Sequence, residues 1–314
     1  MHLVVIMDPV STVQAEADTS FALMEEAQKR GHRVDHCLNT DLYLDGSRLY
    51  ARVARATMQR AAAVPIALGA FEDVSLHDVD AVFVRTDPPF DDNYLWCTLM
   101  LDRVKQDTLV LNDPHGLRQA NEKLYACYFP ELMPETLVSS HKPRIKDFLT
   151  RVGGHAVIKP LGGRGGEGVL VLKNGDANVN AIIEATTLEG RRAAMVQVFL
   201  PAIKIGDKRI LVLDGEPLGA LLRVPSGDDI RSNLRVGGRA TKTELDADDL
   251  RIVEALAPRL RQDGLWFVGI DVIGGKLTEV NVTSPTGIQA MQRLDQQPYC
   301  TRVIEWVERR VAKG

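Results

Sequence analysis

The glycine-rich run at residues 162–168, which reads Gly-Gly-Arg-Gly-Gly-Glu-Gly, most restricts the folds available to this chain. Gly163, Gly165 and Gly168 fit the pattern G-x-G-x-x-G, which binds dinucleotides only where a helix follows. Residues 169–172, Val-Leu-Val-Leu, instead predict a strand. The chain also has no Gly-Lys-Ser/Thr phrase. A Rossmann dinucleotide site and a Walker A loop are therefore both excluded.

Residues 155–159 predict a second strand directly before this run, so the glycines join two antiparallel strands. Such a loop can fold over a nucleoside triphosphate, as the glycine-rich loop of kinases does. Lys159 ends the first strand, where its ammonium group could reach the α- and β-phosphates. The alternative is a surface hairpin with a solvated lysine. The pattern favours the phosphate-binding loop.

A later hairpin, predicted at residues 267–273 and 277–282, carries Asp271, Glu279 and Asn281. Oxygen ligands of this kind suit Mg²⁺. A three-residue loop at 274–276 would place Asp271 opposite Glu279, whereas a two-residue loop would send the carboxylates to opposite faces. The three residues predict a metal site if the register permits it. A solvent-exposed polar face is the alternative.

Basic and polar loops surround these elements. Asp207 and Arg209 directly precede a predicted strand, and Arg223 ends the following strand. Arginine- and glycine-rich residues 225–239 suit recognition of carboxylates and phosphates, although arginines in loops are usually only solvated. Residues 284–287, Ser-Pro-Thr-Gly, predict a turn beside any bound phosphate.

Strands and helices alternate in the first third, which predicts an α/β lobe with a parallel, covered sheet at residues 1–118. Residues 119–200 predict a small α+β lobe, and 201–314 a hairpin-rich lobe. The predicted strands lie at 3–7, 79–84, 108–111, 136–138, 193–199, 210–213 and 217–222. The predicted helices lie at 21–27, capped by Asp18 or Thr19, at 146–152, at 249–262 with a bend at Pro258, and at 299–311.

Composition excludes several partners. The net charge is −4, from 38 basic and 42 acidic residues without a block of like charge, so nucleic acid is not expected. No apolar stretch is long enough for a membrane span, and the apolar start is too short for a signal peptide. The four cysteines are scattered, which predicts reduced thiols in a cytoplasmic protein.

Several phrases in this order resemble the ATP-grasp superfamily and, within it, the bacterial glutathione synthetase family. They lie at residues 7–9, 85–91, 121–123, 134–138, 159–161, 200–204, 206–209, 233–234, 237–238 and 279–286. The resemblance covers almost the whole chain and implies an ATP-grasp fold behind an N-terminal parallel-sheet domain. Asp-Pro-Pro-Phe-Asp and Asn-Val-Thr-Ser-Pro-Thr are fairly specific to that family.

The resemblance also implies roles for individual residues. ATP would be bound by Lys123, Lys159, Gly162, Gly163, Arg164, Gly165, Gly166, Gln197, Val198, Phe199, Leu200 and Asp207. Lys159, Arg209 and Arg223 would be catalytic, and Asp271, Glu279 and Asn281 would ligate Mg²⁺, with Mn²⁺ as an alternative. Candidate substrate-binding residues are Arg85, Ser226, Arg231, Asn233, Gly237, Gly238, Arg239, Ser284, Pro285 and Thr286.

The implied reaction joins γ-glutamylcysteine to glycine through an acyl-phosphate and releases ADP and phosphate. A homo-oligomer is also implied. Other ATP-grasp ligases, such as a D-alanine–D-alanine ligase or a protein-tail glutamate ligase, would share this site chemistry. A non-catalytic nucleotide-binding module and a kinase-like phosphotransferase are alternatives of another class. The chain has no Asp-Phe-Gly or His-Arg-Asp phrase to support a kinase.

Overall fold

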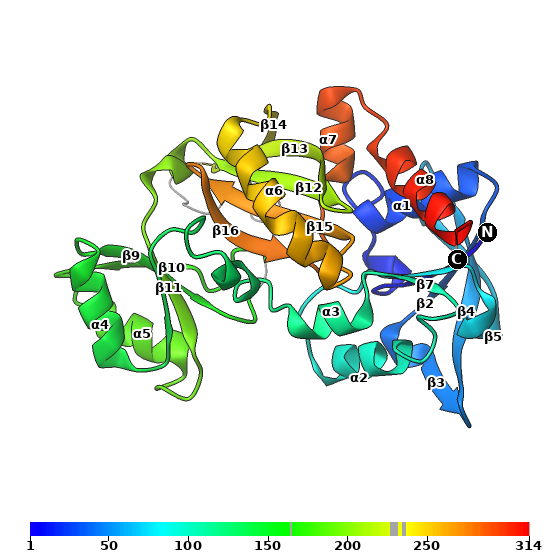
Figure 1. The fold of residues 1–314 in the computed structure, drawn as a ribbon, viewed down its shortest axis with the longest axis horizontal. Coiled ribbons are helices and arrows are strands. Elements are labelled where there is room, and N and C mark those ends of the chain that lie inside the picture. Colours follow the sequence, from blue (N-terminus) through cyan, green and yellow to red (C-terminus); the bar gives the residue numbers. More distant parts are fainter. Residues whose placement is uncertain (164, 227–231, 234–236, 314) are drawn as a thin grey trace.

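The computed structural model describes residues 1–163, 165–226, 232–233 and 237–313, and these residues form three β-sheets with helices packed on them (Figure 1). The sheet of the first third lies at one end of the molecule, and the small sheet of the middle segment lies at the other. The sheet built by the last third lies between them. Among the described residues, no helix is long and apolar enough to cross a membrane.

The first sheet contains a parallel core, as predicted. In it β1 (His2–Ile6) pairs with β2 (Arg33–Cys37) and with β6 (Ala81–Val84), and β6 pairs with β7 (Leu109–Leu111). The side chains of β1 alternate between two hydrophobic clusters, one on each face of the sheet. Burial on both faces explains its unbroken apolar run. Helix α1 (Thr19–Lys29) covers one face, and Asp18 caps it by accepting a hydrogen bond from the Phe21 N–H at 2.8 Å.

Three antiparallel strands extend this sheet and were not predicted. They are β3 (Leu42–Asp45), β4 (Arg48–Met58) and β5 (Ile66–Ser75). β4 pairs with β2, β3 and β5, so the sheet of the N-terminal part is mixed, and its predicted parallel part is confirmed.

The middle segment forms a four-stranded antiparallel sheet. Its order is β10 (Leu170–Lys173), β9 (His155–Pro160), β11 (Ala194–Val198) and β8 (Thr136–Ser139). The antiparallel pairing of β9 and β10 on either side of the glycine-rich run is confirmed. Two helices, α4 (Lys142–Arg151) and α5 (Val179–Thr187), share a hydrophobic cluster with this sheet. Helix α4 begins one turn before the predicted residue 146, with Pro143 in its first turn.

The third sheet is antiparallel and has five strands. Its order is β14 (Arg239–Lys242), β13 (Glu216–Val224), β12 (Asp207–Leu213), β15 (Phe267–Ile273) and β16 (Lys276–Asn281). Helix α6 (Ala247–Gln262) crosses one face of it and includes Pro258 (Figure 1). Asp246 and Asp249 form a capping box at the start of α6.

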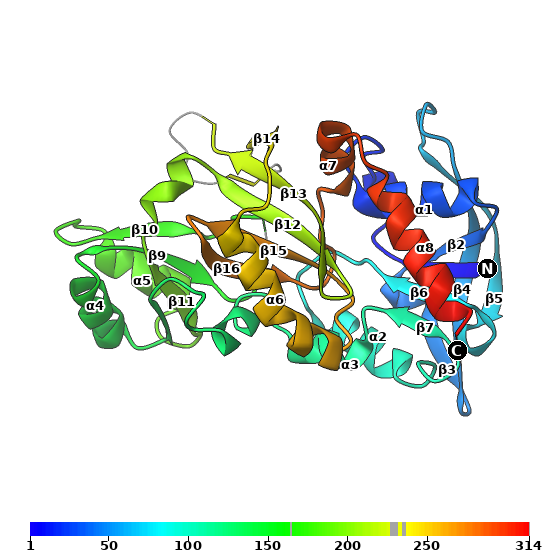
Figure 2. The ribbon, with the colours of Figure 1, turned by 45° about the horizontal axis from the view of Figure 1, so that its top comes forward.

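The last helices return to the N-terminal sheet. Helix α8 (Tyr299–Val311) lies beside α1 in both views (Figures 1 and 2), and Val303 joins the cluster that contains Leu3 and Phe21. The remaining helices are α2 (Asp92–Leu101), α3 (Pro114–Gln119), α7 (Ile288–Asp295) and the short 3-10 turns η1 (Val10–Thr12), η2 (Asn39–Asp41), η3 (Leu76–Asp78), η4 (Tyr125–Tyr128) and η5 (Pro201–Lys204).

A buried amide joins the first and third sheets. Asn112 donates to the carbonyls of Phe267 and Val282, both at 2.8 Å, and accepts from the Phe267 N–H at 2.8 Å. The start of β15 and the exit of β16 are thereby fixed to the end of β7. A buried polar side chain with all these bonds made fixes a single geometry.

Candidate active site

The β15–β16 hairpin brings Asp271 opposite Glu279 by a route that differs from the expected one. Ile273 pairs with Lys276, so the loop has two residues, Gly274 and Gly275, rather than three. Both glycines have positive φ, as a type I′ turn requires. A bulge then adds one residue to β16, which shifts the register so that Asp271 faces Glu279. The pairing on which the metal site depends is therefore present in the two-residue alternative, and the expectation that a two-residue loop would send the carboxylates to opposite faces is wrong, because it did not include the bulge.

Two arginines surround Asp271 in the protein interior. Arg209 Nε and Nη2 donate to its two carboxylate oxygens at 2.5 and 3.1 Å, and Arg223 Nη2 lies 2.9 Å from Oδ2. Burial by itself would raise the pKa of Asp271, but the two guanidinium groups outweigh it and hold that pKa well below its usual range. Asp271 is therefore ionised at neutral pH.

Asp207 lies in the same charge cluster, but its pKa is shifted in the opposite direction to that of Asp271. Arg223 and the Ser232 hydroxyl both donate to its Oδ2, the latter at 3.1 Å, while no described group bonds its Oδ1. Burial raises the pKa of Asp207 to about 6, although Arg223 opposes the shift. Arg223 Nη1 also donates to Asn233 at 3.0 Å. Residues 232–233 of the predicted substrate loop are thus held at the centre of the site.

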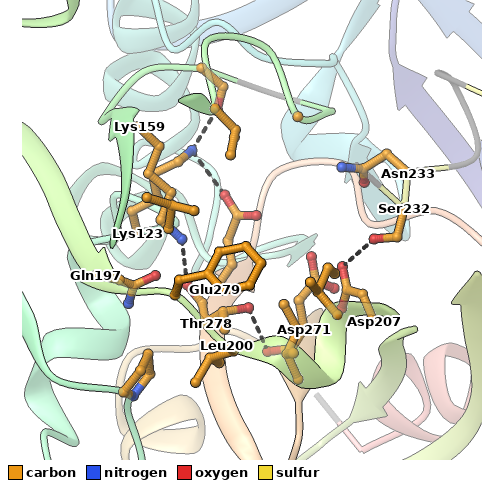
Figure 3. Close-up of a pocket in the computed structure, with 18 of the residues that line it drawn as sticks. Lys123, Lys159, Gln197, Leu200, Asp207, Ser232, Asn233, Asp271, Thr278 and Glu279 are labelled. Carbon is orange, nitrogen blue, oxygen red and sulfur yellow. Dashed lines mark hydrogen bonds and ion pairs between the residues drawn. The ribbon is translucent and has the colours of Figure 1, made fainter. Parts of the chain in front are cut away.

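Two lysine ammonium groups point into the same cavity from the other side (Figure 3). Lys123 Nζ donates to the Gly163 carbonyl at 2.6 Å and to Glu279 Oε1 at 3.0 Å. Lys159 Nζ has one long contact, 3.4 Å to the Thr278 carbonyl, and no ion pair with a described carboxylate. Burial lowers the pKa of Lys159, and neighbouring Lys123 adds to the shift against the attraction of Glu279. An anion bound in this cavity would give the Lys159 ammonium group a counter-ion.

The first cavity contains most of the residues expected at ATP. Its lining includes both lysines, the hinge, the glycines and the carboxylates, namely Lys123, Pro134, Val157, Lys159, Gly163, Gly165, Gly166, Glu167, Val169, Gln197, Val198, Phe199, Leu200, Ile203, Asp207, Ser232, Asn233, Asp271, Ile273, Thr278 and Glu279. Gly162 is not part of this lining, and Arg164 lies outside the described residues.

The hinge at the end of β11 is held from outside the cavity. Gln197 is buried and donates to the Thr136 hydroxyl at 3.0 Å. The Phe199 ring stacks on His155, with ring centroids 4.0 Å apart and planes inclined by 10°. The Phe199 N–H also donates to the His155 carbonyl at 3.1 Å. Strand β9 therefore fixes both the backbone and the side chain of this hinge residue.

A second cavity adjoins the first. Its lining is Asp87, Pro88, Glu122, Gly165, Arg209, Leu221, Arg223, Asn233, Glu279, Asn281, Thr283, Ser284, Thr286 and Gly287. Gly165, Asn233 and Glu279 line both cavities. The candidate substrate residues Asn233, Ser284 and Thr286 are therefore brought together with both arginines and with Asn281.

The other candidate substrate residues lie elsewhere. Arg85 is buried and lines neither cavity; its guanidinium donates to the Ser20 hydroxyl at 3.1 Å and to the Pro285 carbonyl at 2.9 Å. Ser226 donates to the Gly237 carbonyl at 2.5 Å. Neither cavity is lined by Ser226, Pro285, Gly237, Gly238 or Arg239. Arg231 lies outside the described residues.

Several lining residues received no role from the sequence. Glu122 accepts hydrogen bonds from Thr283 and Val282, and Asp87 and Thr283 line the second cavity. Ser232, Glu167 and Thr278 line the first. Glu122 lies inside the phrase Asn-Glu-Lys at residues 121–123, which is the one sequence signal that could have identified it.

Comparisons with known proteins agree with this arrangement. The family model for the prokaryotic glutathione synthetase N-terminal domain matches residues 1–118, and that for the prokaryotic glutathione synthetase ATP-grasp domain matches residues 122–296. A glutathione synthetase of Nostoc sp. is 47% identical, covering 98% of both chains. That of Yersinia pestis is 42% identical, covering 99% of this chain and 98% of its own.

Solved structures confirm the fold at lower identity. The crystal structure of the D-cycloserine synthetase DcsG superposes with a TM-score of 0.66 at 16% identity, covering 98% of this chain and 99% of its own. The ATP-grasp ligase PsnB, complexed with a variant of its minimal precursor, Mg and ADP, gives 0.65 at 16% identity, covering 99% and 98%. The expected ATP-grasp fold is confirmed, and the chain belongs to the prokaryotic glutathione synthetase family.

Proposed function

We propose that this chain is a glutathione synthase, an ATP-dependent ligase that joins the carboxylate of γ-glutamylcysteine to the amine of glycine. The proposal rests on one observation, which is that the two cavities adjoin each other. Because Gly165, Asn233 and Glu279 line both, a phosphoryl group bound in the first would lie beside a carboxylate bound in the second. Reactants held in this way avoid most of the entropy cost of a bimolecular encounter.

The first cavity suits ATP as a substrate. Residues 197–200 line this cavity and would contact the purine, and Val157, Val169, Phe199 and Ile203 supply apolar surface around it. The ammonium groups of Lys123 and Lys159 would contact the phosphates. The buried position and weak partnering of Lys159 favour this role, because a buried cation without a counter-ion is costly.

A divalent cation fits the donor set of the hairpin. Asp271, Glu279 and the amide oxygen of Asn281 would hold it, since Asn281 uses its amide nitrogen to donate to the Gly269 carbonyl at 3.1 Å. These are hard oxygen ligands, which suit Mg²⁺, with Mn²⁺ as an alternative. When bound, the cation would offset negative charge on the transferring phosphoryl group.

The chain's own residues would carry the remaining chemistry. A carboxylate does not react with an amine at neutral pH because its leaving group would be oxide. Transfer of the γ-phosphoryl group makes an acyl-phosphate, the amine attacks its carbonyl carbon, and phosphate leaves. Arg209 and Arg223, which are buried beside Asp271, would stabilise charge on the transferring group. The glycine-rich loop would exclude water that would hydrolyse the intermediate.

Several broader properties belong to the same proposal. Arg85, Asn233, Ser284, Pro285 and Thr286 would form or support the acceptor pocket, together with residues 226, 231 and 237–239. The division into lobes at 1–118, 119–200 and 201–314 would let the middle lobe close over ATP. The substrates are small molecules, with neither nucleic acid nor membrane as a partner. We further propose a cytoplasmic homo-oligomer.

The decisive experiment measures ADP release by the purified protein with ATP and Mg²⁺. ADP should appear at a substantial rate only when γ-glutamylcysteine and glycine are both present, and the product should have the mass of glutathione. Strong release with D-alanine alone or with a glutamate-tailed peptide, and none with these two substrates, would reject the substrate assignment. No release with any acid–amine pair would favour a nucleotide-binding module instead.

A further inference from the structure

Glu122 receives an unusual number of hydrogen bonds from one short segment. Its carboxylate Oε1 accepts from the Val282 N–H at 3.1 Å, from the Thr283 N–H at 3.2 Å and from the Thr283 hydroxyl at 2.8 Å. Its backbone carbonyl accepts from the Val280 N–H at 2.9 Å. This one residue therefore fixes residues 280–283, where β16 ends.

The segment that Glu122 fixes connects two parts of the site. Asn281, a candidate metal ligand, lies within it, and Ser284 and Thr286 in the second cavity follow directly. The Val282 and Thr283 N–H groups lie at the end of the strand, beyond the last ladder pair of β15 and β16, Gly269 with Asn281. Without Glu122 these donors would have no acceptor among the described residues, which destabilises a buried turn.

The neighbours of Glu122 hold the opposite wall of the site. Asn121 donates through Nδ2 to the Leu161 carbonyl at 3.1 Å, and Lys123 donates to the Gly163 carbonyl at 2.6 Å. Asn121 Oδ1 in turn accepts from the N–H groups of Lys123 and Leu124, at 3.1 and 3.0 Å. Residues 121–123 thus join the start of the glycine-rich run to the end of the metal hairpin.

We propose that Glu122 is a positioning residue, which sets the turn at 283–286 relative to the acyl group so that the acceptor amine is aligned for attack. The proposal rests on the function proposed above. In this role Glu122 acts as a hydrogen-bond acceptor, and its negative charge is not required. The alternative is a direct role, in which the carboxylate binds the substrate ammonium or takes its proton. The direct role requires the negative charge of Glu122, whereas the positioning role does not.

Two substitutions separate these roles. Glu122→Gln keeps an oxygen that can accept the same three bonds and removes the charge, whereas Glu122→Ala removes the acceptor. We expect Glu122→Gln to retain activity within about threefold, and Glu122→Ala to lose about 10–100-fold in kcat/KM for glycine, the range typical of residues that orient ligands. The KM for ATP should change by less than about twofold, because that cavity keeps its lysines. Glu131→Ala is the matched control, because Glu131 is an exposed glutamate in the same segment between α3 and β8. This variant should behave as wild type.

A readout independent of turnover is the hydrogen exchange of the Val282 and Thr283 amides. Exchange should accelerate in Glu122→Ala and stay slow in Glu122→Gln. If Glu122→Ala does not fold, Glu122→Asp, whose shorter side chain cannot reach both amides, and Thr283→Ala, which removes one donor, should show the same glycine-specific loss.

Equal losses in Glu122→Gln and Glu122→Ala would overturn the proposal, as would unchanged exchange and activity in Glu122→Ala. Failure of the ligase function itself is distinguishable, since wild-type protein would then release no ADP with the two substrates while the exchange result would still stand.

Discussion

Asp271 faces Glu279 across the β15–β16 ladder because Thr278 is an extra residue in β16. The bulge corrects the face on which Glu279 would otherwise lie, and the Thr278 hydroxyl donates to the Asp271 carbonyl at 3.1 Å within it. Both carboxylates consequently line the first cavity. Bulges commonly redirect a side chain at a functional site in this way.

Replacing Glu279 tests the metal assignment. Glu279→Gln should lower ADP release with both substrates by about 100-fold or more, since it removes a charged ligand, and a change in an outer-shell residue alone costs 10–100-fold. Its far-ultraviolet circular dichroism and melting temperature should stay near wild type, because Glu279 is partly exposed. Undiminished turnover in this variant would refute the assignment, and Glu131→Gln serves as the control.

The two-residue turn predicts which of its two glycines is more costly to replace by alanine. Gly274 and Gly275 have φ values of 57° and 71°, where an added Cβ costs about 1–2 kcal/mol. A Cβ on Gly274 would also lie 2.9 Å from Ala202 Cβ, whereas one on Gly275 would meet the Asp248 carboxylate at 2.8 Å, which can move away. Thermal unfolding should therefore rank Gly274→Ala as less stable than Gly275→Ala. Gly46→Ala, with φ of 60° and no atom within 4 Å, reports the backbone strain alone. The reverse ranking would contradict this description of the turn.

Burial of His36 predicts how stability depends on pH. Burial lowers the pKa of His36 below its ordinary value of 6.5, although a hydrogen bond to the Asp8 carbonyl opposes the shift. The unfolded chain therefore takes up this proton first as the pH falls. The free energy of unfolding should fall as the pH drops below 6.5 and should stop falling once the pH reaches the pKa of His36 in the folded protein. One such group contributes at most about 1.4 kcal/mol per pH unit.

Replacing His36 should remove this slope. Between pH 6.5 and 5, the free energy of unfolding by urea should fall less steeply in His36→Gln than in wild type. His141→Gln, at an exposed position, should retain the wild-type slope. Parallel slopes in wild type and His36→Gln would show that His36 does not titrate in this range.

The stacking of His155 on Phe199 predicts an effect on nucleotide affinity from outside the cavity. A stacked aromatic pair contributes about 0.5–1.5 kcal/mol, so His155→Ala should weaken ATP binding by roughly 2–10-fold. His155→Phe keeps a ring behind Phe199 and should bind ATP as wild type does. Isothermal titration with ATP measures both, with His141→Ala as the control. Equal weakening in His155→Phe would instead indicate a role for the imidazole nitrogens.

Short-range patterns made much of the fold predictable. The apolar run that became β1, the glycine-rich run between β9 and β10, and Asp18 before α1 are local signals, and each is confirmed. The signal for β4 was also present, since buried Ala51 and Val53 alternate with exposed Arg52. β4 also contains Ala51, Ala54 and Ala56, and alanine is a weak strand former, which explains why β4 was missed.

The register of the metal hairpin could not be read from sequence, because the bulge at Thr278 depends on backbone pairing. The placement of Glu122 beside Thr283 likewise depends on a contact between residues 161 positions apart. Arg85 is another case, since the family resemblance made it a candidate substrate residue, whereas only the tertiary structure shows that its guanidinium donates to the Pro285 carbonyl.

The packing of α8 on α1 also affects how the chain can fold during synthesis. Leu3 and Phe21 share a hydrophobic cluster with Val303 and Val307, so one part of this core is synthesised long before the helix that packs on it. Until residue 307 has left the ribosome, α1 lacks the part of its cover that α8 provides, and the apolar surface left exposed is a target for chaperones or proteases. Deleting α8, by ending the chain before residue 299, should thus lower the yield in cells far more than the distance of α8 from the active site suggests.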